Sequence, residues 1–247
     1  MKHDNIFEIT NNYKKQMKTI NSYDELIDDL CSENITMVNP AFIKSILNFY
    51  PNISKVEGDI LECGVWRGGV SIFLSHLFYD RNIWVSDSFQ GFQPLTNAKY
   101  NYDKERHTPN YVQCANGPIG ISLEEVKSNF ETYGLKDEPR IKFLKGFVKE
   151  TLPTSGIEKL ALLRIDVDAF SATLEVLDEM YDKVQPGGYI IFDDSCLYEV
   201  IDALKVFFKK RNLEECIYHP LTHEKCNLYS KYTNTDSGFE TGCYIIK

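Results

Sequence analysis

The sequence predicts a doubly wound α/β domain with a mostly parallel, seven-stranded sheet. Five short apolar runs alternate with segments whose apolar residues recur at helical spacing, which is typical of strands joined by crossover helices. Four of these runs end in carboxylates, namely Glu62, Asp87, Asp166 and the neighbours Asp193 and Asp194. Because the carboxyl ends of parallel strands share one edge of the sheet, we expect a ligand site there.

Residues 1–35 are predicted to form a helical extension in front of a main domain that spans residues 36–247. The second half of the extension is amphipathic, as in a helix that lies on a larger domain as a lid or an oligomer contact. Its apolar face consists of Tyr23, Leu26, Ile27 and Leu30. Asn39 and Pro40 then predict the N-cap and first-turn proline of a helix over residues 40–50.

The five apolar runs are predicted as buried parallel strands. They cover residues 59–63, 83–87, 140–144, 160–166 and 189–193. Helices are predicted over residues 69–79, 122–133, 173–184 and 197–211. Ser122 and Glu125 have the spacing of a capping box at the start of the second of these helices. Candidate strands at residues 215–219 and 243–246 would close the sheet as an antiparallel pair.

Residues 89–120 interrupt this alternation because they are rich in Asn, Tyr, Gly and Pro and show little periodicity. A loop of this length inside a compact domain usually has a function. We therefore expect this insertion to cover the active site.

Composition restricts the class of partner. The chain has 36 acidic and 27 basic residues, a net charge of -9, and no basic cluster, which argues against nucleic-acid binding. Its seven cysteines form no CxxC pair, so reduced intracellular thiols are expected. No apolar run approaches the ~20 residues that span a bilayer, and the N-terminus lacks the apolar core of a signal peptide. These features predict a cytoplasmic protein that does not bind membranes.

The first strand ends in a glycine-bearing turn that leads into a helix, within the segment Gly58-Asp-Ile-Leu-Glu-Cys-Gly-Val-Trp-Arg-Gly-Gly69. Such a turn offers backbone amides and a helix N-terminus to a ligand. Glu62 would repel a pyrophosphate but attract an ammonium or sulfonium cation, which favours S-adenosylmethionine over NAD. Asp87 could accept both hydroxyls of a ribose, or it could be an ordinary exposed acid at a strand end.

A second acidic set lies at the ends of the fourth and fifth strands. Asp166, Asp193 and Asp194 could converge on one hard cation, because adjacent strands lie ~5 Å apart. Oxygen ligands without Cys or His spacing favour Mg²⁺, Mn²⁺ or Ca²⁺ over zinc. The alternative is that one acid caps the following helix, a role that suits Asp168 or Ser195 better than Asp193.

Two further residues have two interpretations each. Arg67 could bind the methionyl carboxylate of the cofactor, or it could be a solvated residue in a surface ion pair. Phe147 could stack on adenine, or it could pack in the core.

Seven segments together resemble one family, the macrocin O-methyltransferases of the TylF/MycF type. They are residues 34–38, 58–69, 86–92, 122–130, 146–153, 160–173 and 186–194, and the similarity runs in order from about residue 34 to residue 210. This family consists of class I enzymes with a Rossmann-like sheet that depend on S-adenosylmethionine and Mg²⁺. They methylate sugar hydroxyls in natural products. The resemblance therefore implies an O-methyltransferase.

The resemblance also implies roles for individual residues. The cofactor contacts would be Thr36, Met37, Glu62, Cys63, Gly64, Val65, Trp66, Arg67, Gly68 and Gly69 at the methionyl end, Asp87, Ser88 and Phe89 at the ribose, Ser122, Gly146 and Phe147 at the adenine, and Asp166. Mg²⁺ (or Mn²⁺) would be bound by Asp166, Asp193 and Asp194. The family usually reads Asp-x-Asp-x-Tyr-Glu-Ser-Thr where this chain has Asp166-Val-Asp-Ala-Phe-Ser-Ala-Thr173, and Tyr where it has Ser195. These departures lie near the acceptor.

The predicted reaction is methylation of a hydroxyl on a sugar or sugar-like acceptor. Asp166 would take the proton, with Asp168 as the alternative base. Usage rich in Lys, Asn and Ile suggests an AT-rich microbial genome and therefore a nucleotide-linked or surface-polysaccharide sugar. A homo-oligomer is expected. The alternatives are a catechol-type small-molecule methyltransferase, favoured by an aromatic pocket, and a cofactor-binding protein without catalysis.

Overall fold

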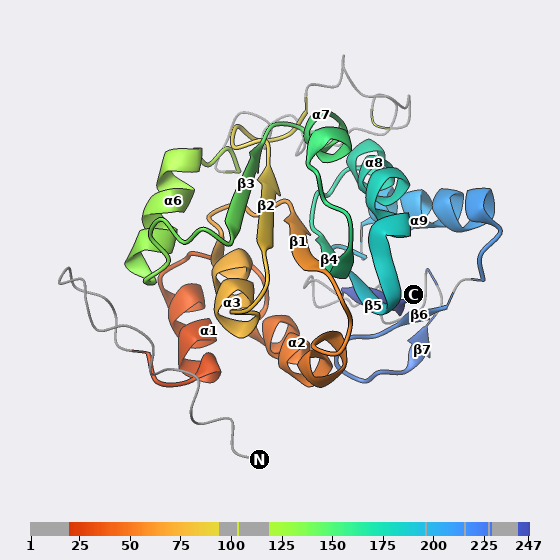
Figure 1. The fold of residues 1–247 in the computed structure, drawn as a ribbon. Coiled ribbons are helices and arrows are strands. Elements are labelled where there is room, and N and C mark those ends of the chain that lie inside the picture. Colours follow the sequence, from red (N-terminus) through yellow and green to blue (C-terminus); the bar gives the residue numbers. More distant parts are fainter. Residues whose placement is uncertain are drawn as a thin grey trace.

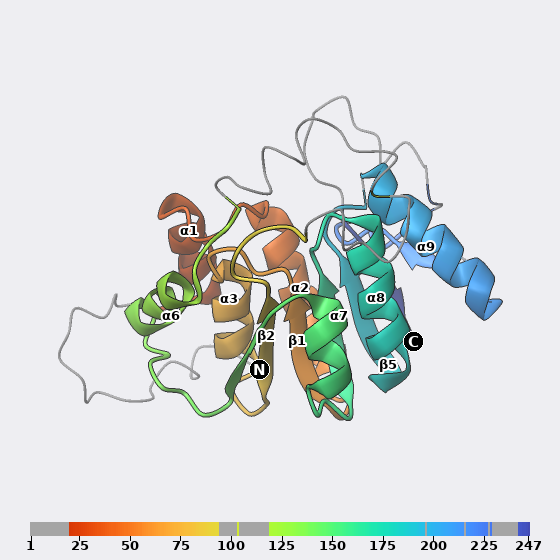
Figure 2. The ribbon, with the colours of Figure 1, turned by 90° about the horizontal axis from the view of Figure 1, so that it is seen from above.

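One sheet lies between two layers of helices in the computed structural model (Figures 1 and 2). The structure describes residues 20–93, 103, 119–195, 197–214, 216–226, 228 and 242–247. Residues 1–19 of the predicted extension and most of the predicted cover over 89–120 lie outside this set. Among the described residues, none of the helices combines the length and the apolar character needed to cross a membrane.

In the described part of the chain the sheet has eight strands, and five of them are parallel. The strands are β1 (Asp59–Cys63), β2 (Ile83–Asp87), β3 (Ile141–Lys145), β4 (Leu160–Ile165), β5 (Val184–Phe192), β6 (Ile217–Tyr218), β7 (Lys225–Cys226) and β8 (Cys243–Ile246). Their order is β3-β2-β1-β4-β5-β8-β6-β7, with β6, β7 and β8 paired antiparallel. The order reverses direction between β1 and β4, which is where sheets of this class bind ligands.

The mostly parallel α/β fold is confirmed, but the described residues form eight strands where seven are predicted. The additional strand is β7, which pairs with β6 through only two residues on each side. Two residues are too few to give an alternating pattern in the sequence. The five predicted parallel strands all form, with ends within a few residues of those expected.

The helices form two layers, each with its own core. They are α1 (Tyr23–Ser32), α2 (Pro40–Ile53), α3 (Gly69–Leu77), α6 (Leu123–Thr132), α7 (Val148–Thr151), α8 (Phe170–Met180) and α9 (Tyr198–Arg211), with 3-10 turns η2 (Leu152–Thr154) and η3 (Tyr181–Lys183). Helices α1, α2, α3 and α6 pack on one face of the sheet, and α7, α8 and α9 pack on the other. The strand ends are therefore covered from both sides.

Helix α1 belongs to the first core. Leu26, Ile27 and Leu30 are fully buried, and each such side chain contributes about 1.5–3 kcal/mol to stability. The side chain of Ser22 caps this helix by accepting a hydrogen bond from the Glu25 amide. Asn39 caps α2 in the same way through the Ala41 amide (2.9 Å). Pro40 occupies the first turn, as predicted.

The boundary between α8 and β5 differs from the prediction. Helix α8 begins at Phe170 instead of Thr173 and ends at Met180, and β5 already starts at Val184. Pairing with β4 shifts register near the start of β5, so the Pro-Gly-Gly segment forms an irregularity inside the strand and not a turn before it. The sequence pattern extends the helix too far because Tyr181 and Val184 continue its apolar spacing.

Candidate active site

The turn after β1 brings the chain against the end of β4. Gly64 has a left-handed φ of 81°, and its amide donates to the Ser86 carbonyl (2.9 Å). A Cβ on Gly64 would lie 1.7 Å from the Asp166 carbonyl oxygen, so no other residue fits. A Cβ on Gly69 would lie 2.6 Å from the Ile35 carbonyl oxygen. The two glycines thus allow close approach to β4 on one side and to residues 34–38 on the other.

Asp87 at the end of β2 fixes this turn. Its carboxylate accepts hydrogen bonds from the amides of Val65 (2.8 Å), Trp66 (3.3 Å) and Phe89 (2.8 Å). Burial raises the pKa of Asp87, and these N–H donors oppose the shift. The side chain also lines the main pocket. Asp87 therefore organises the turn from a position where it can also accept a hydrogen bond from a ligand.

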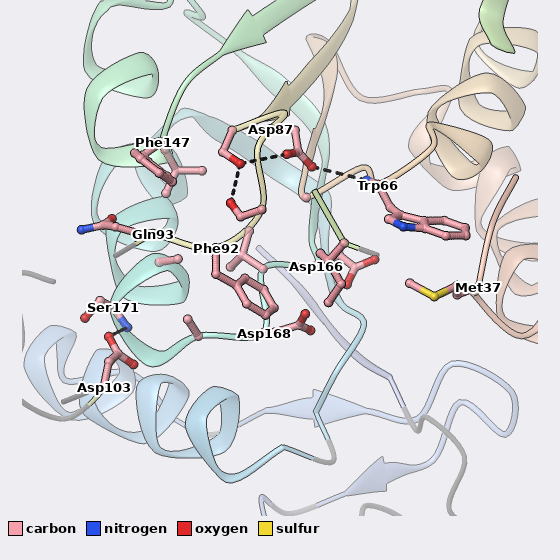
Figure 3. A pocket seen from close by; sticks show the side chains of 18 residues that line it. Met37, Trp66, Asp87, Phe92, Gln93, Asp103, Phe147, Asp166, Asp168 and Ser171 are labelled. Atoms are coloured by element: carbon pink, nitrogen blue, oxygen red, sulfur yellow. Dashed lines mark hydrogen bonds between the residues drawn. The ribbon is translucent and has the colours of Figure 1, made fainter. Parts of the chain in front are cut away.

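A pocket lies beyond the carboxyl ends of β1, β2 and β4 (Figure 3). In this view Trp66 and Met37 lie on one side, Phe147 on the other, and Asp166 and Asp168 between them. Eight predicted site residues line it: Met37, Gly64, Trp66, Asp87, Ser88, Phe147, Asp166 and Asp168. Residues expected to hold the cofactor and residues expected to act on the acceptor thus share one cavity.

The other predicted cofactor residues do not line this pocket. They are Thr36, Glu62, Cys63, Val65, Arg67, Gly68, Gly69, Phe89, Ser122 and Gly146. Thr36 is buried and accepts from the Val38 amide (3.1 Å). Phe89 packs in the core beside Phe143, and Ser122 caps α6. The Gly146 amide donates to the Asp87 carbonyl (2.9 Å).

Arg67 makes contacts that match its non-cofactor interpretation. Its guanidinium donates to the Asn34 carbonyl (3.0 Å), lies 3.3 Å from a Glu125 oxygen and stacks over the Trp66 ring. These contacts tie the glycine turn to residue 34 and to α6. They also engage the side chain of Glu125, which the sequence pattern assigns to a capping box with Ser122.

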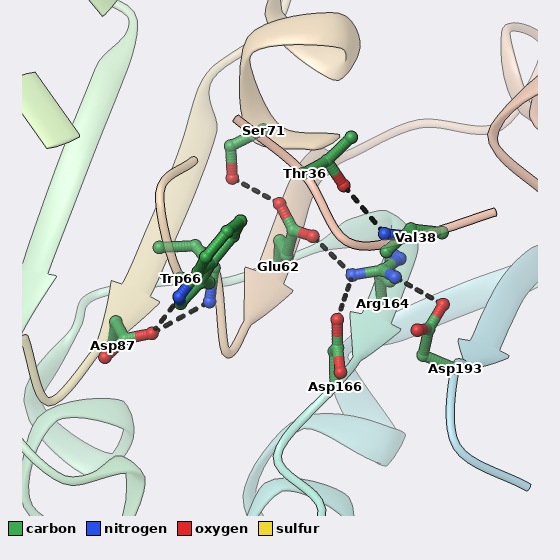
Figure 4. A network of polar contacts seen from close by, with 10 residues as sticks. Thr36, Val38, Glu62, Trp66, Ser71, Asp87, Arg164, Asp166 and Asp193 are labelled. Atoms are coloured by element: carbon green, nitrogen blue, oxygen red, sulfur yellow. Dashed lines mark hydrogen bonds and ion pairs between the residues drawn. The ribbon is translucent and has the colours of Figure 1, made fainter. Parts of the chain in front are cut away.

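A buried arginine that the sequence patterns did not single out lies at the centre of the strand ends (Figure 4). The Arg164 side chain is only 2% exposed and forms ion pairs with Glu62 (2.5 Å), Asp166 (2.9 Å) and Asp193. Burial alone would lower the pKa of Arg164, but the three carboxylates raise it well above its ordinary value. The second Glu62 oxygen accepts from the Ser71 hydroxyl. Glu62 therefore lies behind the pocket and not in its wall.

Three carboxylates converge beside the pocket, which Asp166 and Asp168 line, and they differ by one member from the predicted metal set. Asp166, Asp168 and Asp194 each offer an oxygen within 4.8 Å of the others, whereas Asp193 pairs with Arg164. Asp168 joins the group through a left-handed backbone (φ 56°). Burial, followed by neighbouring negative charge, raises the pKa of both Asp166 and Asp194 well above the ordinary value. We call Asp166, Asp168 and Asp194 the acidic cluster.

The acid that caps α8 comes from a distant part of the chain. Asp103 is buried, and its carboxylate accepts from the amides of Phe170 (3.1 Å) and Ser171 (3.0 Å). The capping alternative for Asp168 is therefore wrong. Nothing in the sequence signals this role, because Asp103 lies in a segment without periodicity. Arg164 did carry a signal, since it is the one charged residue in the apolar run 160–165 and a buried charge needs partners.

Part of the predicted cover contributes to the pocket. Gly91, Phe92, Gln93, Asp103 and Ile119 all line it. The remaining residues of the interval 89–120, namely 94–102 and 104–118, lie outside the described residues. That this interval covers the acceptor therefore stays a prediction.

Comparison with known proteins identifies similar sequences. The model of the family described as macrocin-O-methyltransferase (TylF) matches residues 3–223. Over 165 residues the chain is 39% identical to mycinamicin III 3''-O-methyltransferase of Micromonospora griseorubida, covering 65% of this chain and 64% of that protein. Over 146 residues it is 41% identical to demethyldecarbamoylnovobiocin O-methyltransferase of Streptomyces niveus, covering 57% and 54%. The matched regions thus span less than two thirds of these relatives' lengths.

A solved structure agrees over a larger share of the chain. The O-methyltransferase NovP superposes with a TM-score of 0.71 at 30% identity, covering 86% of this chain and 81% of that one. CalS11, a calicheamicin methyltransferase, superposes with a TM-score of 0.58 at 18% identity, covering 93% and 87%, which supports the fold alone.

Proposed function

The chain belongs to the macrocin O-methyltransferase family, and on that premise we propose that it transfers a methyl group from S-adenosylmethionine to a hydroxyl of a sugar or sugar-like acceptor. One observation carries the proposal. The glycine turn, Asp87 and the acidic-cluster members Asp166 and Asp168 line a single pocket at the switch point of the sheet. Methyl donor and acceptor must meet in one cavity for direct transfer, and this pocket offers groups suited to each.

The donor half fits a nucleoside with a charged sulfonium. Asp87 would accept from the ribose, Trp66 and Met37 would contact the methionyl part, and Phe147 would contact the adenine. The surplus of carboxylates over guanidinium groups at the strand ends favours a positively charged donor. The uncharged thioether of the product, S-adenosylhomocysteine, loses this attraction, which helps the product to leave.

The acidic cluster fits a hard divalent cation. Three carboxylate oxygens within 4.8 Å of one another form a donor set that suits Mg²⁺ or Mn²⁺. The raised pKa values of Asp166 and Asp194 reflect the cost of keeping these acids ionised together in a buried place. A bound Mg²⁺ would offset that cost and, through its charge, lower the pKa of a nearby acceptor hydroxyl.

The residues of the chain supply the remaining chemistry. Asp166 would accept the proton of the acceptor hydroxyl, with Asp168 as the alternative base, since both face the pocket. The acceptor oxygen then attacks the donor methyl carbon while the carbon–sulfur bond breaks, which leaves S-adenosylhomocysteine. Much of the rate would come from holding oxygen, methyl and sulfur in line.

A sugar acceptor is supported by the named relatives and by three polar side chains in the described wall of the pocket. Gln93, Asp168 and Ser171 line it beside an apolar surface formed by Phe92, Ile119, Val167, Ala169 and Ala172. Sugar hydroxyls need such hydrogen-bonding groups. The named relatives act on mycinamicin III and demethyldecarbamoylnovobiocin, while the composition of this chain favours a nucleotide-linked or polysaccharide sugar.

A direct assay tests the proposal. The purified chain is incubated with S-adenosylmethionine, Mg²⁺ and a panel of nucleotide-linked sugars, with simple catechols as the competing acceptor class. We expect S-adenosylhomocysteine and a methylated sugar by mass spectrometry. Methylation of catechols alone would replace the sugar assignment. Binding of S-adenosylmethionine by calorimetry without turnover of any acceptor would favour a non-catalytic cofactor-binding protein.

A further inference from the structure

Arg164 joins the ends of three neighbouring strands. Glu62 is its register partner on β1, Asp166 follows β4, and Asp193 follows β5. One guanidinium nitrogen, Nη1, donates to both Glu62 and Asp166, and the other, Nη2, donates to Asp193 (Figure 4). A planar guanidinium fixes the directions of its donors, so these three carboxylates are held in one defined arrangement.

Asp166 belongs to two groups at once. It pairs with Arg164 on the buried side and contributes an oxygen to the acidic cluster on the pocket side. Glu62 is also shared, because it accepts from Ser71 of α3 as well as from Arg164. A continuous polar path therefore runs from the helix behind the glycine turn to the acidic cluster. Neither Arg164 nor Glu62 lines the pocket, so both act from behind it.

We infer that Arg164 is a positioning residue that sets the orientation of Asp166 in the acidic cluster, with Glu62 and Asp193 as its fixed supports. This inference rests on the proposed function, because it assigns Arg164 a role in cation binding. Without the guanidinium, the Asp166 carboxylate would lose the donor that fixes its orientation on the buried side.

Two conservative substitutions test the role of this network. Arg164→Lys keeps one positive charge but cannot bridge three carboxylates in a plane, because an ammonium is a point charge. Glu62→Gln keeps the size of the side chain and its ability to bond Ser71, but removes the charge that Arg164 binds. Glu62 lies outside both the acidic cluster and the pocket wall, so it cannot act as a cation ligand itself, and a loss of affinity in both variants points to their shared partner network around Arg164.

Matched controls lie at the opposite edge of the sheet. Arg81→Lys alters another partly buried arginine, which donates to the carbonyls of Ser54, Val56 and Gly58. Asp59→Asn removes one negative charge from the start of β1, where Asp59 accepts from the Trp84 indole (2.8 Å). Both controls perturb partly buried polar contacts without touching the carboxyl ends of the strands.

The measurements are Mn²⁺ affinity by electron paramagnetic resonance, S-adenosylhomocysteine affinity by calorimetry, and thermal unfolding. For Arg164→Lys and Glu62→Gln we expect Mn²⁺ affinity to fall about 10- to 100-fold, the usual effect of removing a supporting partner behind a metal ligand. Binding of S-adenosylhomocysteine should persist, which would show that the pocket is intact. Arg81→Lys and Asp59→Asn should bind Mn²⁺ as the unsubstituted chain does.

The possible results distinguish a failure of the positioning role of Arg164 from a failure of the proposed cation site. Native Mn²⁺ affinity in folded Arg164→Lys and Glu62→Gln would overturn the positioning role, and so would loss of both ligands together, since that indicates a general structural role. If Arg164→Lys does not fold, the Mn²⁺ affinity of Glu62→Gln is the deciding measurement. If the unsubstituted chain binds S-adenosylhomocysteine but no Mn²⁺, the cation site itself is wrong and the inference falls with it.

Discussion

At the residue scale, the site depends on Gly64, because only a residue without a side chain fits at this position. Gly64 lets the end of β1 lie directly against the Asp166 carbonyl, so the glycine turn and the acidic cluster lie side by side. The contact also aligns Asp166 through its own amide, which donates to the Cys63 carbonyl (2.8 Å). A single methyl group at residue 64 would force these strand ends apart.

We predict that Gly64→Ala abolishes S-adenosylhomocysteine binding and destabilises the chain strongly. The new Cβ would lie 1.7 Å from backbone that cannot move without breaking the sheet. Gly156→Ala is the matched control, because Gly156 has a similar φ of 76° but no atom within 4 Å of the place that an added Cβ would take. The control should lose only about 1–2 kcal/mol from the left-handed backbone. Calorimetry and urea unfolding measure both effects, and equal losses in the two variants would contradict the steric explanation.

At the element scale, α8 depends on a residue that is distant in sequence. Its own N-cap residue, Ala169, offers no side-chain acceptor, and Asp103 supplies the carboxylate instead. This contact fastens one point of the interval 89–120 to the helix that follows the acidic cluster. The capping interaction therefore also shapes the acceptor side of the pocket.

We predict that Asp103→Ala lowers the free energy of unfolding by about 0.5–2 kcal/mol through the lost cap. It should also raise the KM for the acceptor, because the pocket wall at Ser171 loses its hydrogen bond to the Asp103 carboxylate. Ser122→Ala removes the cap of α6, which lies away from the pocket wall, and should lose similar stability with an unchanged acceptor KM. Urea unfolding and steady-state kinetics provide the comparison. Unchanged KM in Asp103→Ala would restrict Asp103 to a structural role.

At the scale of the whole molecule, acidic charge is concentrated at one edge of the sheet. The chain carries a net charge of -9, and Arg164 pairs with three of the carboxylates at this edge. Among the described residues, seven carboxylates lie around the pocket or behind it, those of Glu62, Asp87, Asp103, Asp166, Asp168, Asp193 and Asp194. Folding brings these charges together at a cost. That cost links the stability of the protein to pH and to cations.

We predict that the stability of the cation-free chain declines as pH rises from about 4 towards neutrality. Asp166 and Asp194 have folded-state pKa values above their unfolded value of about 3.9, so the folded state binds more protons across this window. Their contribution is therefore complete at low pH and is lost as pH rises through the folded pKa.

Unfolding in EDTA and in saturating Mg²⁺, repeated for Asp194→Asn, measures this linkage. Mg²⁺ should stabilise the chain increasingly as pH rises, because it binds the ionised carboxylates. Asp194→Asn should flatten the pH dependence in EDTA and weaken the response to Mg²⁺. Asp178→Asn, which alters a carboxylate paired with Lys210 on the surface, is the control and should behave as the unsubstituted chain. A response to Mg²⁺ that does not depend on pH would contradict the prediction.

Local patterns in the sequence were sufficient to predict the sheet, the glycine turn and the acids at the strand ends. Strand burial and left-handed turns impose residue types at fixed positions, so apolar runs and glycines reveal them without knowledge of distant contacts. Hence the five parallel strands, the cap of α2 by Asn39 and the location of the pocket could be predicted. The resemblance of the same segments to one family indicated the reaction class.

Which acids act together depends on the tertiary structure. Asp193 and Asp194 are adjacent in sequence, yet one faces Arg164 and the other faces the acidic cluster, because consecutive residues point in different directions. Asp103 caps α8 although the two are 67 residues apart in sequence. Arg164 pairs with carboxylates at the ends of three different strands. These pairings depend on the register and twist of neighbouring strands. Register and twist set the distances between side chains of different strands, and a local sequence pattern does not reveal those distances.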